Sequence, residues 1–537
     1  MQHPGGLSDY LSRFLTQFFG NPLRAALIVA VLLMIVQRQV LSLAYKLGGK
    51  KSAYIPLTFI PSILFLQLLC DENFMLTGVV SLVMALAAIQ LCLVLRHRQF
   101  RMAYILLMIP VVYMFAGGTA LVFILLSLAN ELINGEIKGE VRVFFILGCG
   151  LLLILLPLIA KWIYVQYPLS KLWTGGDFYR FQNIFPGGLG LLWVLTAAIP
   201  VLFRSLPSSC HKLWKTFAGM GVQIILLIIL TLYGLMQTTD WKKEEVMRYD
   251  YFAQHRQWDE IIRLADRRSP SSPLSVSLLN LALSKQGLLP DRMFHYYQNR
   301  SEGLMPSFMR DFTVPFVSGE VYYHLGFINT AQRYAFEAME SIPDSQKSVR
   351  AIKRLAETNL LNGEYEVAAK YLHLLQNTLY YKVWADETLL CLSDEKRIEA
   401  NPEWANLRKY RTKKDFLFSE TEKDMMLGIV LQQDPTNRPV YEYLMAYCLL
   451  TKDLEHFYRY YPIGQVTYRT IPKSYQEALV YIWGLSNSDI SNCPFSISNE
   501  VKKQVQEYKR IYTGYSNPEQ LLRPYSNTFW YYLHFRQ

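Results

Sequence analysis

The sequence predicts an all-α protein: a polytopic bundle of about eight transmembrane helices, followed by an α-solenoid of tetratricopeptide-like helical hairpins. Two observations lead to this fold class. Long apolar runs fill the first half and end with residues 217–238, which carry no charge and can cross a hydrocarbon core of about 30 Å. The rest of the chain is charged, aromatic and patterned for helices. We therefore expect a transmembrane domain over residues 1–238 and a soluble helical domain over residues 239–537.

The first 23 residues lack the basic segment, apolar core and cleavage site of a signal peptide. Ser8 is in position to cap a short amphipathic helix carrying Tyr10, Leu11 and Phe14, and we expect this helix to lie at a membrane interface. Because no targeting signal is present, we expect a further span before Met1 in a longer gene product. Apolar runs follow at residues 24–45, 54–70, 75–95, 102–133, 143–164, 189–203 and 217–238.

The run at residues 102–133 decides the topology. At 1.5 Å per residue its length is about 48 Å, too long for one upright helix. Gly117 and Gly118 lie at its midpoint, with Pro110 upstream. We interpret it as two short spans, or a re-entrant hairpin, broken at residues 116–118, so that the chain returns to its starting side.

Loop charge supports this break, because it gathers most basic residues on one side, which the positive-inside rule makes cytoplasmic. The chain ends and the tail then lie outside the cytoplasmic membrane, in the periplasm if the cell has two membranes. A single helix at 102–133 would instead place Lys242, Lys243 and Arg248 inside. The residues on the cytoplasmic side are Lys46, Lys50, Lys51, Arg96, Arg98, Arg101, Lys138, Arg142, Arg204, Lys212 and Lys215.

Five polar residues in the predicted outer segments are candidates for chemistry. Carboxylates at a membrane surface beside aromatic residues are what a polytopic glycosyltransferase would use, as a base or metal ligand, on a lipid-linked sugar. The alternative is structural: the neighbouring Gly-Gly pairs are ordinary turn residues, and Asp177 with Arg180 is a possible local i,i+3 pair. The candidates are Asp9, Asp71, Glu72, Asp177 and Arg180.

Several function classes find no support. Basic residues lie in short loops rather than in blocks, which argues against nucleic-acid binding. The seven cysteines form no CxxC pair and no Cys/His spacing suits zinc, so no metal site is predicted and the cofactor is unknown. We expect the cysteines to be small buried residues. No nucleophile elbow, P-loop, HExxH or dinucleotide motif is present.

From Tyr249 onward, helical hairpins recur at periods near those of tetratricopeptide repeats. In the clearest unit, Gly363 makes the turn, and small Ala356 and Ala368 let the two helices approach. The preceding unit has Gly326, Ala331, Ala338 and Pro343 at similar offsets. Looser units contain Gln257-Trp258 with Ala265, Ala282 with Gly287, and residues 446–462. Stacked hairpins of this kind form an α-solenoid, and an irregular helical domain is the alternative.

Several strings spread along the chain together resemble an uncharacterised bacterial family of multi-pass membrane proteins with a tetratricopeptide-like tail. The likeness covers almost the whole chain, and family members usually begin with one more hydrophobic span. The resemblance implies an architecture and no assigned activity. The strings are PGGLSDYLSRFLTQFF (4–19), DRMFHYYQN (291–299), YYHLGFINTAQRYAFEAME (322–340), KRLAETNLLNGEYEVAAKYL (353–372), YEYLMAYCLL (441–450) and SYQEALVYIW (474–483).

Two functions compete at this stage. In the first, which the repeats favour, the chain is an envelope scaffold of the bacterial inner membrane whose tail binds a protein partner, with Tyr460 and Trp530 as test positions. In the second, the outer loops form a glycosyltransferase-like enzyme acting on a lipid-linked sugar. Eight spans are more than an anchor needs, which favours the enzyme. Membrane lipid is an expected partner in both.

Overall fold

The computed structural model is all-helical, and no strand occurs among the residues that it describes. These residues are 3–49, 51–133, 139–181, 184–206, 213–311, 313–341, 347–411, 418–486 and 492–536. The chain divides into two compact units, Met1–Asp240 and Trp241–Gln537. The division falls two residues after the domain boundary expected from the sequence.

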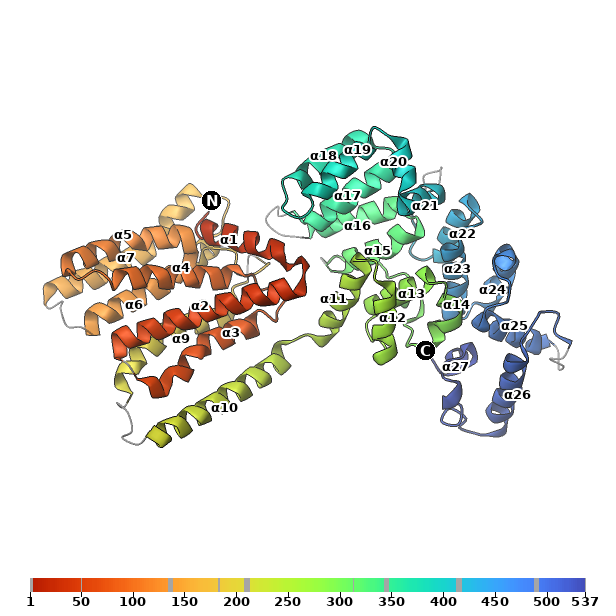
Figure 1. The fold of residues 1–537 in the computed structure, drawn as a ribbon, viewed down its shortest axis with the longest axis horizontal. Coiled ribbons are helices and arrows are strands. Elements are labelled where there is room, and N and C mark those ends of the chain that lie inside the picture. Colours follow the sequence, from red (N-terminus) through yellow and green to blue (C-terminus); the bar gives the residue numbers. More distant parts are fainter. Residues whose placement is uncertain are drawn as a thin grey trace. The chain divides into compact units, whose positions relative to one another are not determined.

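The first unit is a helical bundle. Short 3₁₀ segments at Ser52–Phe59 and Gly117–Thr119 precede α3 and α6. The helices α2, α4, α5, α6 and α9 pack against one another (Figure 1), around a core of aliphatic and aromatic residues. Its α-helices are α1 (Gly6–Thr16), α2 (Pro22–Gly48), α3 (Ile60–Leu68), α4 (Thr77–Cys92), α5 (Arg98–Ala116), α6 (Ala120–Ile133), α7 (Glu140–Ile163), α8 (Leu169–Thr174), α9 (Gly187–Ser205) and α10 (Leu213–Thr238).

Five apolar helical segments of the described chain are long enough to cross a membrane, fewer than the eight expected. Two expected spans correspond to the shorter apolar helices Ser52–Leu68 and Thr77–Cys92. The remaining difference arises because the run Arg98–Ile133, which was expected to form two spans, counts as one segment although it is not straight. The five are Pro22–Gly48, Arg98–Ile133, Glu140–Ile163, Gly187–Ser205 and Phe217–Thr238.

The run Arg98–Ile133 reverses direction at its glycine pair, as the sequence predicted. The helix α5 ends at Ala116, and Gly117 has φ +65° and ψ −139°, outside the helical region. In a straight helix Arg101 and Glu131 would lie about 45 Å apart. Instead the Arg101 guanidinium bonds both Glu131 carboxylate oxygens, with Nη2 to Oε2 at 3.1 Å. The helices α5 and α6 are therefore an antiparallel hairpin (Figure 1).

The helix α1 buries its polar side and exposes its apolar side. Ser8, Asp9 and Ser12 are buried, whereas Tyr10 is 63% and Phe14 is 45% exposed. The predicted cap is wrong, because α1 begins at Gly6 and the Ser8 hydroxyl lies within the first turn, donating to the Gly5 carbonyl at 2.7 Å. This inward polar face places the Asp9 side chain inside the unit.

The second unit consists of helical hairpins. All five units predicted from the sequence are helix–turn–helix hairpins, and each turns on a residue at positive φ. Gly363 has φ +82° and makes the turn of its hairpin, as the sequence predicted. Arg256 and Lys452 adopt φ +57° and +62° without being glycine. The helices α15, α16, α17, α18 and α19 pack one against the next in chain order.

The helices of this unit vary in length from one turn to four. The described aromatic residues at the C-terminus belong to the core: Trp530 is 1% exposed, and Phe529, Tyr531 and Tyr532 are buried. The α-helices are α11 (Trp241–Gln254), α12 (Trp258–Arg267), α13 (Pro273–Lys285), α14 (Leu289–Arg292), α15 (Val314–Leu325), α16 (Ile328–Glu340), α17 (Val349–Asn362), α18 (Tyr365–Gln376), α19 (Lys382–Cys391), α20 (Glu395–Ala400), α21 (Pro402–Tyr410), α22 (Lys423–Gln433), α23 (Arg438–Thr451), α24 (Leu454–Tyr460), α25 (Lys473–Ser486), α26 (Asn499–Gly514) and α27 (Phe529–Phe535).

Candidate functional site

Two of the candidate carboxylates meet at one end of the first unit. Asp9 lies on α1, and Asp177 lies in the loop after α8. The Asp177 backbone N–H donates to Asp9 Oδ1 at 3.0 Å, across 168 residues of sequence. Asp9 is 2% and Asp177 is 5% exposed. We call Asp9, Asp177 and the three basic residues beside them, His3, Arg13 and Lys171, the carboxylate centre.

Both oxygens of Asp177 are bonded to cations. Lys171 Nζ donates to Oδ1 at 2.5 Å, and Arg13 Nη2 donates to Oδ2 at 2.8 Å. The Lys171 side chain is only 7% exposed, whereas the Arg13 side chain is 45% exposed. Arg13 therefore connects the buried carboxylate with the surface. Lys171 was not among the five candidates from the sequence, although it stands six residues before Asp177.

Asp9 is only half satisfied. Its Oδ1 accepts the Asp177 amide, but its Oδ2 is buried and accepts no hydrogen bond from the residues that the structure describes. His3 Nε2 lies 3.3 Å from this oxygen, close enough for an ion pair when the imidazole is protonated. Burial and the Asp177 carboxylate raise the pKa of Asp9 to about 6. A carboxylate with this pKa can accept and return a proton near neutral pH.

Glycine backbones hold the centre together. The loop after α8 lies directly against the reversal between α5 and α6, and Gly118 N–H and Gly175 carbonyl are 3.5 Å apart. A Cβ on Gly118 would lie 2.1 Å from the Thr174 carbonyl oxygen, and one on Gly117 would lie 2.3 Å from that of Gly175. A Cβ on Gly5 would likewise lie 2.6 Å from the Gly176 Cα. Only glycine allows such approaches.

These glycines carried a signal that sequence reasoning underused. The pair at 117–118 was interpreted as a helix break and the pair at 175–176 as a turn, and the glycine at position 5 was given no role. The structure packs all three on one another. We call this contact of Gly5, Gly117, Gly118, Gly175 and Gly176 the glycine junction.

Asp71, Glu72 and Arg180 belong to a neighbouring pair of loops. The Met75 N–H donates to the Phe178 carbonyl at 3.0 Å, and the Arg180 N–H to that of Asn73 at 2.8 Å. Asp71 accepts the Asn73 N–H at 2.9 Å and the Tyr179 hydroxyl at 2.8 Å. Asp71 thus stabilises a turn and its partner loop. Glu72 and Arg180 lie on the same two loops, outside the carboxylate centre.

His3, Asp9 and Asp177 also have the spacing of a metal site, since one ligand atom from each lies within 4.8 Å of the others. The surrounding charges do not favour a divalent ion. Lys171 and Arg13 already neutralise the carboxylates, and any ion on Asp177 would lie beside both cations. The centre suits proton transfer and anion binding better than metal coordination.

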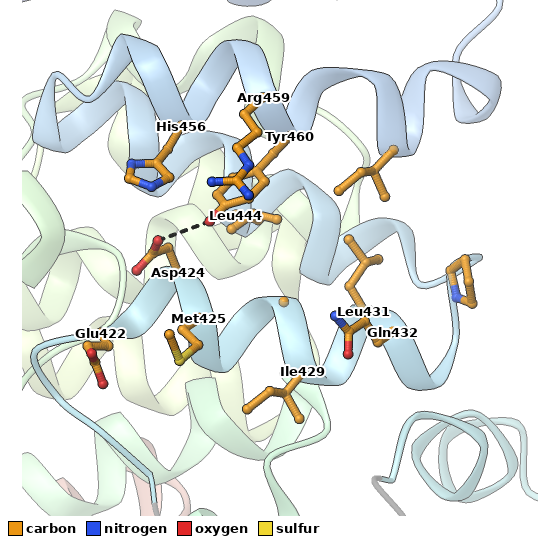
Figure 2. A pocket seen from close by; sticks show the side chains of 13 residues that line it. Glu422, Asp424, Met425, Ile429, Leu431, Gln432, Leu444, His456, Arg459 and Tyr460 are labelled. Atoms are coloured by element: carbon orange, nitrogen blue, oxygen red, sulfur yellow. Dashed lines mark hydrogen bonds between the residues drawn. The ribbon is translucent and has the colours of Figure 1, made fainter.

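The second unit contains a groove of about 690 Å³ between α22 and α24, with α23 as its floor. Figure 2 shows His456, Arg459 and Tyr460 of α24 facing Asp424 and Met425 of α22. The Tyr460 hydroxyl donates to Asp424 Oδ2 at 3.3 Å across it. Of the two partner-binding test positions, Tyr460 lines this groove, and buried Trp530 does not.

Gly428 lines the groove, and close packing does not explain why this position is a glycine. Gly428 is in the interior of α22, where glycine costs roughly 1 kcal/mol relative to alanine. No atom lies within 4 Å of the position its Cβ would take. The missing side chain leaves the helix backbone open to an occupant of the groove.

A family model described as a family of unknown function (DUF6057) matches residues 1–536. No curated protein and no solved structure matches the chain.

Proposed function

The chain belongs to the DUF6057 family, and we propose that it is an integral membrane enzyme that transfers a sugar from a lipid-linked donor at the carboxylate centre. One observation carries the proposal. Asp9 and Asp177, nominated separately from the sequence, converge with His3, Arg13 and Lys171 at one end of a bundle of membrane-length apolar helices. The sequence alone favoured a scaffold; this convergence favours the enzyme.

Membrane insertion is supported by the outer surface of the first unit. The helix α10 buries none of its apolar window and α7 buries 22%, so both present apolar side chains outward. The inverted polarity of α1 fits the same surroundings. We propose eight crossings, with α5 and α6 as two short ones and the other short crossings formed by residues 52–68 and α4.

The distribution of cations supports the orientation. Lys51 donates to the carbonyls of Phe203 and Arg204, and Arg204 donates to that of Ile133, at the helix ends where α2, α6 and α9 stop. Arg101 lies at the start of α5, away from the glycine junction. The positive-inside rule makes this end cytoplasmic. The carboxylate centre then faces outside, on the periplasmic face of a bacterial inner membrane, and so does the tail.

The centre has the groups that glycosyl transfer requires. An acceptor hydroxyl attacks the anomeric carbon while the bond to the donor's lipid phosphate breaks. The hydroxyl proton passes to Asp9 Oδ2, and Arg13 and Lys171 balance the negative charge of the leaving phosphate. His3 orients Asp9 and takes the proton onward. Half-exposed Arg13 is the group that first meets the phosphate.

We test this with substitutions in a deletion strain, followed by mass spectrometry of envelope glycans and by membrane abundance. Asp9→Asn should abolish transfer at normal abundance, because the amide cannot take a proton. Asp71→Asn and Glu72→Gln are controls in the neighbouring loop and should leave the glycans unchanged. Unchanged glycans with Asp9→Asn would refute the enzyme.

Topology is tested separately. A periplasmic reporter such as alkaline phosphatase, fused after Gln537, should be active, and a cytoplasmic fluorescent reporter should be dark. The opposite pattern would place the carboxylate centre in the cytoplasm and remove the proposed donor from its reach.

The scaffold remains a second candidate because of the groove between α22 and α24. We propose that the hairpins of the tail form a solenoid and that this groove binds the segment of a partner protein, or the acceptor, that the tail presents. A photocrosslinker at Met425 should capture the occupant. Gly428→Leu fills the groove while favouring the helix, and should abolish capture; Gly484→Leu, at an exposed helical glycine outside the groove, should not.

If capture persists when the groove is filled, the occupant binds elsewhere. If capture is lost while the glycans stay normal, the groove serves a scaffold rather than the enzyme.

A further inference from the structure

A hollow of about 320 Å³ lies on the first unit, on the outward side of α2 beside α4. Its lining changes character along α2. Val31, Met34 and Ile35 form an apolar end, whereas Arg38, Ser42 and Gln90 form a polar end together with Gln39. A ligand that fits both ends has an apolar chain and a polar group that attracts a cation.

The hollow continues an apolar stripe on α2. Leu23 is 79%, Leu27 is 65% and Met34 is 58% exposed, at helical spacing on one side. The next outward residue is Arg38, which is also exposed. If α2 crosses a membrane, Arg38 faces lipid rather than the bundle interior. Arginine in that position requires a counter-charge.

Arg38 makes no ion pair with any residue in the described part of the chain. It lies 16 residues from Pro22 and 10 residues from Gly48, or about 24 Å and about 15 Å along the helix. Its side chain can therefore reach toward the headgroups at the Gly48 end. The anions available at that depth are lipid phosphates.

A second polar group in the hollow lacks a donor. Gln39 Nε2 donates to the Val83 carbonyl at 3.2 Å, and Gln90 Nε2 donates to the Gln39 carbonyl at 3.3 Å. Gln39 Oε1 is buried and accepts no hydrogen bond among the described residues. Gln39 and Gln90 thus form a polar wall at the end of the hollow that Arg38 occupies.

We propose that this hollow binds an anionic glycerophospholipid of the bilayer, with its phosphate on Arg38, its headgroup at the polar end beside Ser42 and Gln90, and an acyl chain along Val31 and Met34. The inference rests on the proposed membrane insertion and not on the proposed reaction. The site is at the end of α2 away from the carboxylate centre, so it does not compete for the lipid-linked donor.

Native mass spectrometry of the full chain in detergent, titrated with phosphatidylglycerol, tests the site. Arg38→Gln should weaken binding by about tenfold, the effect of losing one charge-assisted contact. Ser42→Phe fills the hollow with Arg38 in place and should weaken binding similarly. Arg142→Gln, an exposed arginine at the start of α7, is the matched control and should change nothing.

Phosphatidylcholine, which carries no net charge, should bind more weakly than phosphatidylglycerol, and Asp9→Asn should bind both as the natural chain does. Equal binding by the natural chain, Arg38→Gln and Ser42→Phe would overturn the site, as would no binding at all. Displacement of phosphatidylglycerol by equimolar polyprenyl phosphate would instead assign the hollow to the donor and overturn the bilayer lipid. Normal envelope glycans with Arg38→Gln would leave the enzyme proposal intact.

Discussion

The two units each bury a charged centre, and the two centres are built differently. In the second unit Glu320 of α15 is 3% exposed and accepts from Arg354 at 2.7 Å, from Arg256 at 3.3 Å and from His324 at 3.2 Å. Burial alone would raise its pKa, but Arg354, His324 and Arg256 outweigh burial and hold the pKa well below its usual range. Both oxygens of Glu320 are occupied.

Asp9 in the first unit is buried to the same degree but keeps one oxygen without a hydrogen bond, and its pKa is raised to about 6. A fully paired carboxylate has no capacity left for a substrate and serves stability. A half-paired one costs stability and can exchange a proton, which is the pattern of functional sites. The two centres therefore differ in hydrogen-bond satisfaction and not in burial.

The first prediction concerns how the carboxylate centre is held. If backbone packing holds it, Gly118→Leu should prevent the first unit from assembling, because its Cβ alone would lie 2.1 Å from the Thr174 carbonyl oxygen. We expect loss of folded protein, measured as membrane abundance and monodisperse yield after purification. Gly150→Leu on α7, where nothing lies within 4 Å, is the control and should express normally. Normal yield of Gly118→Leu would mean that the glycine junction is not rigid.

The second prediction concerns the structural centre. Glu320→Gln should destabilise the second unit by about 3 kcal/mol, because Arg354 and Arg256 would each lose one of two carboxylate partners and keep only Glu357 and Glu403. Hydrogen exchange of the α15 and α17 amides in the full chain measures the loss. Glu260→Gln, which breaks an exposed i,i+3 pair with Arg263, should cost less than about 1 kcal/mol. Similar exchange in both variants would contradict the structural role of Glu320.

The sequence predicted those features that leave a pattern in a short stretch of residues. The reversal at Gly117, the turn at Gly363 and the five hairpins follow from spacing and turn chemistry, and Asp9 and Asp177 were nominated because they stand beside predicted membrane ends. Their contact could not be predicted, because a hydrogen bond across 168 residues leaves no periodicity. His3 and Arg13 were missed for the same reason. The number of membrane-length helices was overestimated because two short apolar helices resemble spans in composition.

A third buried carboxylate sharpens the comparison. Glu477 of α25 is 1% exposed; its Oε2 accepts the Phe529 N–H at 2.7 Å, and its Oε1 has no partner among the described residues. Burial raises its pKa to about 8 from an ordinary value of 4.5. It is half paired like Asp9, but no ion pair with it is found in the described chain.

Because the folded state holds this proton more tightly than the unfolded state, the contribution of Glu477 to stability is present below about pH 4.5 and is lost as the pH rises toward 8. Raising the pH from 6 to 8 should destabilise the second unit by about 2 kcal/mol. Glu477→Gln should remove this dependence, measured by hydrogen exchange of α25 and α27 in the full chain. An unchanged pH dependence in the variant would show that Glu477 is already ionised.

The smallest stability effect is expected at the functional centre. Asp9→Asn keeps an oxygen for the Asp177 amide and removes a charge that is buried at a cost. The raised pKa of Asp9 means that its stabilising contribution is complete below about pH 3.8 and lost as the pH rises through about 6. At pH 7.5 the variant should therefore be as stable as the natural chain, within about 1 kcal/mol, or slightly more stable.

Asp177→Asn is the contrasting variant, because it would leave Lys171 buried without a full counter-charge and should destabilise the unit. Thermal unfolding of the purified full chain in detergent measures both. The natural chain should also lose transfer activity as the pH falls through about 6, when Asp9 becomes protonated. A large loss of stability with Asp9→Asn, equal to that with Asp177→Asn, would mean that Asp9 is a structural residue like Glu320 and that the half-paired oxygen does not mark a functional site.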